Sequence, residues 1–317
     1  MNNEIPVFFT IDNGYAPFLA VALRSAIQNA DPKRQYKAIV LHQDLSAENC
    51  SRLKALETAN FKIELTPMQA NFDALDDRMS NRLRCDYFTL TIYFRLFIPA
   101  MFHQYDKGIY IDSDVVVADD LSKLFDTDLG DHFIGACNDL SIADIPPLVA
   151  YTENAIGVKK EEYINSGVLL MNLKKMRECN FEGHFLTLLN TYHFDSIAPD
   201  QDYINAICNG KIHYLDQAWD AMPNDAKPPL AHPCIIHYNL FSKPWCYDGI
   251  QYSEEFWQYA AESGYLKEIK AYKAAYTEEK KQADRECLAL LVRRGTEIPE
   301  NEITFKKMHD KGVKIRL

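Results

Sequence analysis

The sequence predicts an α/β protein whose mixed, mostly parallel sheet is flanked by helices and followed by a helical C-terminal appendage. Its first hundred residues alternate short β-rich runs with helical patterns, which favours βαβ units. Further apolar runs of strand length recur as far as residue 238. From about residue 250, long charged side chains at helical spacing take their place. We therefore expect one α/β domain over residues 1–250 and a helical, basic appendage over residues 251–317.

The first helix should open at Pro17, because proline suits the first helical turn, and Ser46 is a suitable N-cap for the second. A third helix is expected over residues 87–97, stopped by Pro99, and another should begin at Pro199. Strands are expected over residues 6–9, 36–41, 61–65, 108–117 (interrupted by the sequence Asp-Ser-Asp at 112–114), 133–136, 168–171, 211–215 and 234–238. The appendage is expected to hold a helix over residues 253–294, which Gly295 would end as a left-handed residue.

The charge balance excludes one class of function. The 317 residues hold 34 Lys and Arg against 45 Asp and Glu, a formal net charge of −11. A general nucleic-acid coat derives its affinity from the neutralisation of phosphates by Lys and Arg, so no nucleic-acid partner is expected.

The N-terminus has no basic segment followed by a hydrophobic core, and no apolar run approaches membrane-spanning length. These features indicate a cytoplasmic protein.

The sequence Asp112-Ser113-Asp114 is the first candidate for chemistry. Alternation along a strand places Asp112 and Asp114 on one face, where the two carboxylates repel each other unless a positive charge lies between them. Oxygen ligands in this arrangement suit Mg²⁺ or Mn²⁺, and the carboxyl end of a strand is where ligands bind in open α/β sheets. The alternative is that these residues only end a strand and cap the next segment.

Three other segments carry candidate residues. In the turn over residues 10–15, Asp12 could accept a hydrogen bond from a nucleotide base and Tyr15 could stack on it, although the turn has no GxGxxG pattern. His237 follows apolar residues near a strand end, where it could bind a metal, and Lys243 could neutralise a phosphate. The acids that follow Pro199 could face a cleft or only complement the helix dipole. Each segment alone is equally consistent with a structural role.

Together, and in this order, the segments resemble the retaining glycosyltransferases of family 8, over about residues 5–247. The resemblance covers Phe9–Tyr15, Tyr93–Leu96, Tyr110–Val115, Asn165–Leu173, Asp200–Asp202, His237–Tyr238 and Lys243–Trp245. It departs at Gly14, where relatives often have Asn, and at the run Ile145-Pro146-Pro147 in a loop that covers the donor in relatives.

This resemblance implies a GT-A fold with a Rossmann-like nucleotide-binding half, a UDP-sugar donor, a saccharide or glycolipid acceptor and a divalent metal, Mn²⁺ favoured over Mg²⁺. It implies the metal ligands Asp112, Asp114 and His237. It implies nucleotide contacts from Thr10, Asp12, Tyr15, Asp112, Ser113 and Lys243. For the donor sugar it implies Arg95, Asp139, Asn165, Asp200 and Gln201, and the catalytic candidates are Gln201, Asp202 and Asp139.

The implied reaction moves a hexose, glucose or galactose, in lipopolysaccharide or other cell-surface glycan synthesis. Because Gln201 is a neutral amide and a poor nucleophile, same-face attack on a short-lived oxocarbenium ion is favoured over two displacements. Two other functions stay open. A haloacid-dehalogenase-type phosphatase would use Asp112 as nucleophile and Asp114 as acid/base, and a non-catalytic protein would bind a sugar nucleotide without turnover.

The C-terminal segment has two interpretations. Its apolar patch Leu288–Val292, Arg293-Arg294 and the Lys-rich end could lie on the inner membrane surface as a peripheral contact. Alternatively, the patch packs on the catalytic domain and the cations are solvated.

Overall fold

The computed structural model describes residues 4–68 and 93–317. Its strands are β1 (Glu4–Ile11), β2 (Gln35–His42), β3 (Phe61–Pro67), β4 (Gly108–Ile111), β5 (Val115–Val117), β6 (Ile134–Ala136), β7 (Val168–Met171), β8 (Ile212–Tyr214) and β9 (Ile235–His237). Its α-helices are α1 (Ala16–Gln28), α2 (Ala47–Lys54), α3 (Phe94–Met101), α4 (Leu121–Phe125), α5 (Pro146–Tyr151), α6 (Leu173–Glu178), α7 (Phe181–Tyr192), α8 (Pro199–Cys208), α9 (Ser253–Glu262), α10 (Leu266–Ala274), α11 (Glu278–Glu297) and α12 (Phe305–Asp310).

The sheet is mixed and mostly parallel, as predicted. Within the described ranges, seven strands pair in the order β3-β2-β1-β4-β7-β6-β8, and β5 pairs with β9 in a second, two-stranded sheet. Strand β7 is antiparallel to β4 and β6, whereas the other neighbours in the large sheet are parallel. The parallel strands therefore share one carboxyl edge, where side chains distant in sequence can meet.

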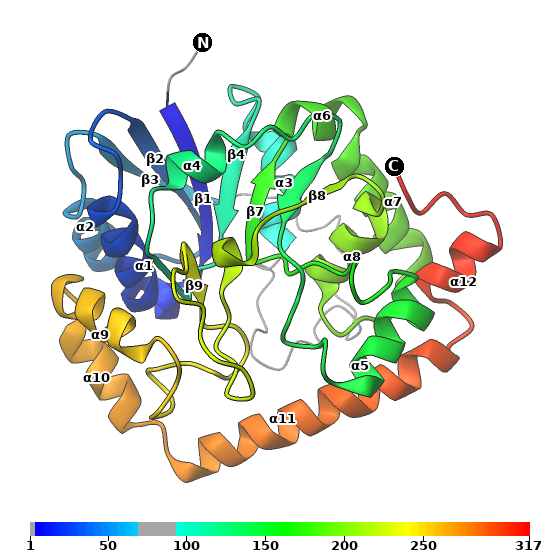
Figure 1. The fold of residues 1–317 in the computed structure, drawn as a ribbon. Helices are drawn as coiled ribbons and strands as arrows, with labels where there is room; N and C mark the ends of the chain where they lie inside the picture. Colours follow the sequence, from blue (N-terminus) through cyan, green and yellow to red (C-terminus); the bar gives the residue numbers. More distant parts are fainter. Residues whose placement is uncertain (1–3, 69–92) are drawn as a thin grey trace.

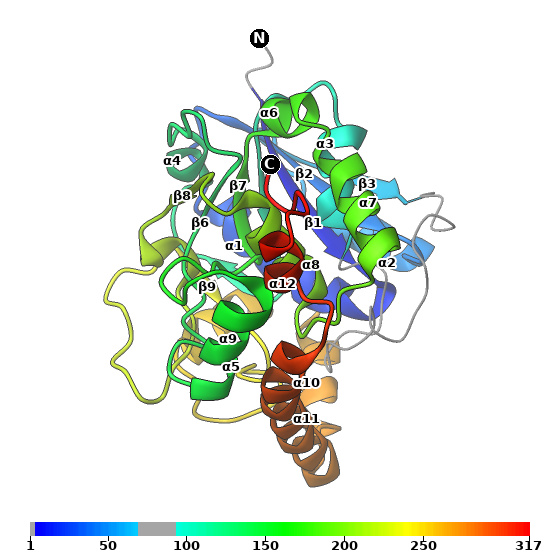
Figure 2. The same cartoon turned by 90° about the vertical axis from the view of Figure 1, so that its right-hand side faces the viewer.

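Helices cover both faces of the large sheet (Figures 1 and 2). Alternate residues of β1 face opposite sides: Val7 and Phe9 join a core that includes residues of α1, α9 and α10, and Phe8 joins a core that includes residues of α3, α7 and α8. The strongly apolar β-runs in the sequence arise from this burial on both sides.

Three helix starts agree with their sequence signals. Pro17 lies in the first turn of α1, and the Ser46 hydroxyl accepts a hydrogen bond from the Asn49 N–H at 3.2 Å. Pro199 is the first residue of α8. In each case a residue that fits the helix start sets the boundary, as expected.

The expected end of the third helix is wrong. Residues 87–92 lie outside the described ranges, and α3 runs through Pro99 to Met101. Proline removes one backbone donor from a helix, but Ile98 and Pro99 are both buried in this one. We attribute the continuation of α3 to this tertiary packing, which outweighs the local preference to stop.

The helix expected over residues 253–294 is three helices, α9, α10 and α11. Gly264 follows the end of α9 with φ of +80°, a left-handed conformation that suits glycine and lets the chain turn into α10. Gly295 does not end α11 but lies inside it. A Cβ there would be 2.9 Å from Leu148 Cδ2 and 3.2 Å from the Pro147 carbonyl oxygen, so Gly295 lets α11 approach α5 closely.

The segment over residues 251–317 shares its packing with the rest of the chain. Phe256 and Ile269 belong to the core on one face of the sheet, and Phe305 and Ile315 belong to the core on the other. The Leu317 N–H also donates to the Ile207 carbonyl at 3.1 Å. Among the helices within residues 4–68 and 93–317, none is both long and apolar enough to cross a membrane.

Candidate active site

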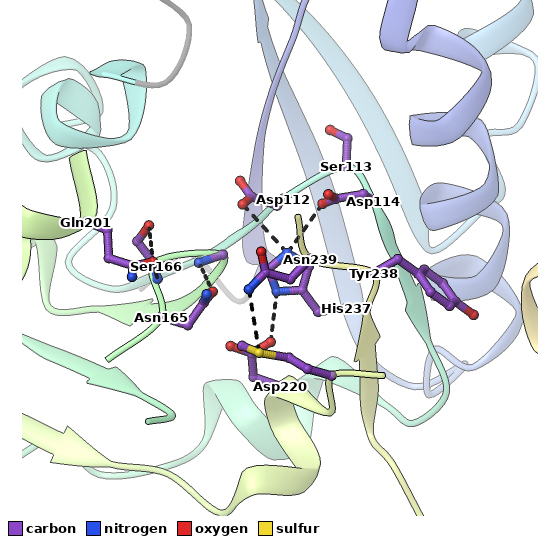
Figure 3. A network of polar contacts seen from close by, with 12 residues as sticks. Asp112, Ser113, Asp114, Asn165, Ser166, Gln201, Asp220, His237, Tyr238 and Asn239 are labelled. Atoms are coloured by element: carbon purple, nitrogen blue, oxygen red, sulfur yellow. Dashed lines mark hydrogen bonds and ion pairs between the residues drawn. The ribbon is translucent and has the colours of Figure 1, made fainter. Parts of the chain in front are cut away.

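Strand pairing brings the Asp-Ser-Asp sequence and His237 together. Strand β5 starts directly after Asp114 and pairs antiparallel with β9, so that His237 lies opposite Val115. The Tyr238 N–H donates to the Asp114 carbonyl at 2.9 Å, which fixes the end of this pairing. His237, although far away in sequence, thus lies beside the two carboxylates (Figure 3).

Asp112, Asp114 and His237 each offer a ligand atom, and these atoms lie within 4.8 Å of one another. His237 Nε2 is 3.4 Å from Asp114 Oδ1 and 3.9 Å from Asp112 Oδ2. Two carboxylates and an imidazole form a donor set that suits Mn²⁺ and related divalent ions. The three side chains therefore fit the metal site that the sequence predicts.

Positive charges of the chain compensate the carboxylates. Lys243 Nζ lies 2.6 Å from Asp114 Oδ2, and Arg95 Nη2 lies 2.9 Å from Asp112 Oδ1. Burial opposes ionisation of Asp114, but Lys243 and His237 outweigh it and hold the pKa of that carboxyl well below its ordinary value. Burial by itself would lower the pKa of His237, yet Asp220 and Asp114 raise it to about 10.

The absence of a side chain at Gly167 leaves room for His237 and Asp112. A Cβ at this position would lie 2.2 Å from His237 Cε1 and 2.9 Å from Asp112 Oδ2. The antiparallel pairing of β4 with β7 brings Gly167 here, and its carbonyl accepts the Asp112 N–H at 2.7 Å. A residue with a side chain would therefore displace the imidazole or the carboxylate.

Arg95 connects the carboxylate pair to the start of α8. Its Nε lies 3.0 Å from Asp200 Oδ2, and its Nη1 donates to the Ser166 carbonyl at 2.7 Å. Asp200 is fully buried, and its Oδ1 has no hydrogen-bond partner among the described residues. A buried carboxylate oxygen without a partner is costly, so a donor group on a ligand would stabilise it.

Gln201, Asp139 and Asn165 form a second polar cluster next to Ser166. Gln201 Nε2 donates to Asp139 Oδ2 at 2.8 Å, while Gln201 Oε1 accepts the Ser166 N–H at 3.1 Å. Asn165 Nδ2 donates to the same Asp139 oxygen at 3.2 Å. All four side chains are buried. The structure therefore brings together three of the residues predicted for the donor sugar.

The Asp202 carboxylate forms hydrogen bonds with a different group of residues. It is fully buried and accepts hydrogen bonds from the Tyr151 and Tyr163 hydroxyls, each at 2.6 Å, from the Ser196 hydroxyl and from the Ala198 N–H at 3.1 Å. These donors occupy the carboxylate and hold the turn before α8. The catalytic role expected for Asp202 stays a prediction.

The predicted nucleotide residues lie around the end of β1. Thr10 Oγ1 is 2.9 Å from the Tyr110 hydroxyl, and the Ser113 hydroxyl donates to the Thr10 carbonyl at 3.4 Å. Asp12 Oδ1 accepts the Tyr15 N–H at 3.0 Å. This turn therefore lies beside the Asp-Ser-Asp sequence, at the carboxyl edge of the sheet.

Two further residues support the cluster and had not been predicted. Asp220, at the end of a short 3₁₀ helix (Gln217–Asp220), accepts a hydrogen bond at 2.9 Å from Nδ1 of His237 and is fully buried. The Tyr110 hydroxyl donates to Asp112 Oδ1 at 2.7 Å. Tyr110 belongs to the matched motif over residues 110–115, whereas no sequence pattern marks Asp220.

An Asp–Asp–His cluster with a partly exposed Asp112, at the carboxyl edge of a mostly parallel sheet, is typical of an enzyme that handles a phosphorylated ligand with a metal. The sequence profile described as Glycosyl transferase family 8 matches residues 6–249. The chain belongs to this family. The match gives no support to the phosphatase alternative, which we do not retain.

Known relatives agree with this assignment. A protein of Haemophilus influenzae named as a glycosyltransferase is 30% identical over 221 residues, which cover 69% of this chain and 64% of the relative. The lipopolysaccharide 1,2-glucosyltransferase of Escherichia coli is 26% identical over 210 residues, 58% of this chain and 59% of that one. The chain thus spans less than two thirds of the length of these two relatives.

Solved structures identify the fold. The galactosyltransferase LgtC, crystallised with donor and acceptor sugar analogues, has a TM-score of 0.69 at 27% identity, over 81% of this chain and 96% of its own. The bifunctional glycosyltransferase WbbM has a TM-score of 0.74 at 24% identity, over 87% of this chain and 52% of its own. The predicted GT-A fold is confirmed.

Proposed function

We propose that this protein is a retaining, metal-dependent glycosyltransferase. It moves glucose or galactose from a UDP-sugar to a saccharide or glycolipid acceptor, in the synthesis of lipopolysaccharide or another cell-surface glycan. The observation that carries the proposal is the convergence of Asp112, Asp114 and His237 within a region that matches family 8. The donor and acceptor analogues named for LgtC support a nucleotide-sugar donor and a saccharide acceptor here.

Asp112, Asp114 and His237 would hold the divalent ion, with Mn²⁺ favoured. When bound, it would supply positive charge to the departing diphosphate. Lys243 is buried and lies within reach of the same site, so its ammonium adds to that charge. Thr10, Asp12, Tyr15 and Ser113 would hold the nucleoside at the end of β1.

The donor sugar would lie between the cluster and α8. Asp200 Oδ1, which has no partner among the described residues, would accept a sugar hydroxyl, and Arg95 would hold Asp200 in place. Asp139 and Asn165 would line the same side. Each of these roles uses a buried side chain with a fixed orientation, which favours one bound position of the sugar.

Gln201 occupies the reaction centre in this proposal. Its amide is held at both ends, by Asp139 and by the Ser166 N–H, so it can stabilise positive charge at the anomeric carbon through its oxygen. The two carboxylates considered as nucleophiles, Asp139 and Asp202, already accept several hydrogen bonds. We therefore favour same-face attack by the acceptor hydroxyl, with Gln201 positioning and stabilising, over a covalent intermediate.

The direct test incubates the protein with Mn²⁺ and a panel of UDP-sugars and measures UDP release. We expect release from UDP-glucose or UDP-galactose, a product that keeps the anomeric configuration of the donor by NMR, and about a hundredfold lower kcat for Gln201→Ala. Asp131→Asn, which changes a mostly exposed carboxylate, is the matched control and should act as the wild type. UDP binding without release from any donor would instead identify a non-catalytic sugar-nucleotide-binding protein.

A further inference from the structure

A cavity of about 400 Å³ opens beside the proposed reaction centre. Its lining includes Asp139 and Gln201. The segment before α5, α5 itself, the loops over residues 222–226 and 239–242, and helix α11 also contribute to it. Its volume is in the range of small-molecule sites. A molecule in this cavity would reach the reaction centre from the side of α11.

Helix α11 contributes Leu288 and Leu291 to the wall. The helix crosses the end of the molecule toward which β1 points, and both views place it there (Figures 1 and 2). The close approach of Gly295 to Pro147 and Leu148 holds it against α5. Helix α11 follows the region that the family profile matches, which ends at residue 249. Its side chains are therefore not among those on which the family assignment rests.

The lining is apolar over most of the α5 and α11 sides, where Leu148, Leu288 and Leu291 lie, and Phe241 adds an aromatic ring. Its charged members are the carboxylates of Asp139, Asp144 and Asp225, of which Asp144 is paired with Lys227 at 2.7 Å. Carboxylates repel an anionic ligand, whereas an apolar wall favours one with apolar surface.

The side chain of Asn239 suggests that the ligand of this cavity has hydroxyl groups. It lines the cavity, is only 6% exposed, and its Oδ1 has no hydrogen-bond partner among the described residues. A buried amide oxygen of this kind is stabilised by a donor such as a sugar hydroxyl. The cavity thus combines polar side chains of the proposed reaction centre with apolar side chains of α11.

We propose that this cavity binds the acceptor, and that the acceptor is an uncharged saccharide with an apolar aglycone that lies against Leu288 and Leu291 of α11. The inference rests on the proposed transferase function and adds the chemical class of the acceptor. Asn239 would bind a hydroxyl of the saccharide, and α11 would bind the aglycone.

The test compares octyl and methyl glycosides of glucose, galactose, N-acetylglucosamine and lactose, together with octyl glucuronide, as acceptors for the wild-type protein. For at least one saccharide, the octyl glycoside should have a KM at least tenfold below that of its methyl counterpart, and octyl glucuronide should be a poorer acceptor than octyl glucoside. If no octyl glycoside is better than its methyl glycoside, or if the glucuronide is preferred, the proposal is wrong.

Two variants assign the effect to α11. Leu288 is 38% exposed, so Leu288→Gln should fold, and it should raise the KM of the octyl acceptor to that of the methyl acceptor. Ala289→Gln changes an exposed neighbour that does not line the cavity and should keep the octyl preference. An octyl preference that survives Leu288→Gln would contradict the role of α11. Release of UDP, measured with and without each glycoside, separates the two proposals. Its absence in every mixture would contradict the transferase function itself, whereas release that does not depend on the octyl chain would contradict only the acceptor proposal.

Discussion

Each carboxylate of the Asp112–Asp114 pair has its own cation in the folded chain. Arg95 lies against Asp112, and Lys243 lies against Asp114, with His237 between the two carboxylates. Two like charges at this distance, one of them buried, would otherwise destabilise the fold, and removal of Lys243 would leave the buried Asp114 without its closest cation. The charges that hold the site together are therefore the same ones that the proposed reaction uses.

Asp220 should act as a positioning residue for His237. Its hydrogen bond to Nδ1 fixes the imidazole so that Nε2 points toward the carboxylates. Asp220→Asn should weaken Mn²⁺ binding by about 10–100-fold, the usual effect of such a partner on a metal-ligating histidine. A Mn²⁺ titration followed by electron paramagnetic resonance measures this, with Asp131→Asn as the control. Unchanged affinity in a variant with an unchanged circular dichroism spectrum would show that Asp220 does not position the imidazole.

The sequence allows the three metal ligands to be predicted, but not the residue that holds the His237 imidazole in place. Asp112 and Asp114 follow an apolar strand, and His237 ends another, so their pattern is visible. Asp220 lies 17 residues before His237 in a short helix that no motif marks, and its role depends on the pairing of β5 with β9. For Asp202 the sequence indicates more than the structure supports. Its position next to Gln201 suggests a catalytic role, whereas its carboxylate accepts hydrogen bonds from two tyrosines that are distant in sequence.

At the scale of elements, α11 shows how a glycine can be misinterpreted. A glycine near the end of a charged helix predicts a left-handed terminator, but Gly295 is helical and faces α5. Both roles depend on the missing Cβ, and the sequence does not distinguish them. In contrast, the central strands β1, β4 and β7 were predictable from apolar runs because both of their faces are buried.

Gly295→Val should destabilise the protein by about 1–3 kcal/mol, because the added side chain meets Leu148 and the Pro147 backbone. Valine has a better helix propensity than glycine, so a destabilisation would come from the packing. Urea unfolding measures the free energy, and Thr296→Val, one residue along on the exposed side, should change it by less than about 0.5 kcal/mol. A Gly295→Val protein as stable as the wild type would show that α11 and α5 are not closely packed.

At the scale of the molecule, the C-terminal segment completes both cores. Phe256 and Ile269 pack on one face of the sheet, and Phe305 and Ile315 pack on the other. Within the patch Leu288–Val292, Leu291 is buried and Leu288 lines the cavity, while Arg294 pairs with Asp195. These contacts favour packing on the catalytic domain. The membrane contact stays a prediction.

A chain ended after residue 250 should therefore not fold cooperatively. Loss of residues 251–317 would expose apolar residues of both cores, and burial of such residues is the main favourable contribution to folding. Differential scanning calorimetry should show no sharp unfolding transition for the shortened chain. A transition like that of the full chain would mean that residues 251–317 form an independent unit.

The central claim is that a divalent cation held by Asp112, Asp114 and His237 binds the diphosphate of a UDP-sugar. Isothermal titration of UDP into the wild-type protein and into Asp114→Ala, each with and without Mn²⁺, tests it most directly. We predict that Mn²⁺ strengthens UDP binding to the wild type and has no effect on the variant. The account would be contradicted if Asp114→Ala bound UDP in the presence of Mn²⁺ as tightly as the wild type.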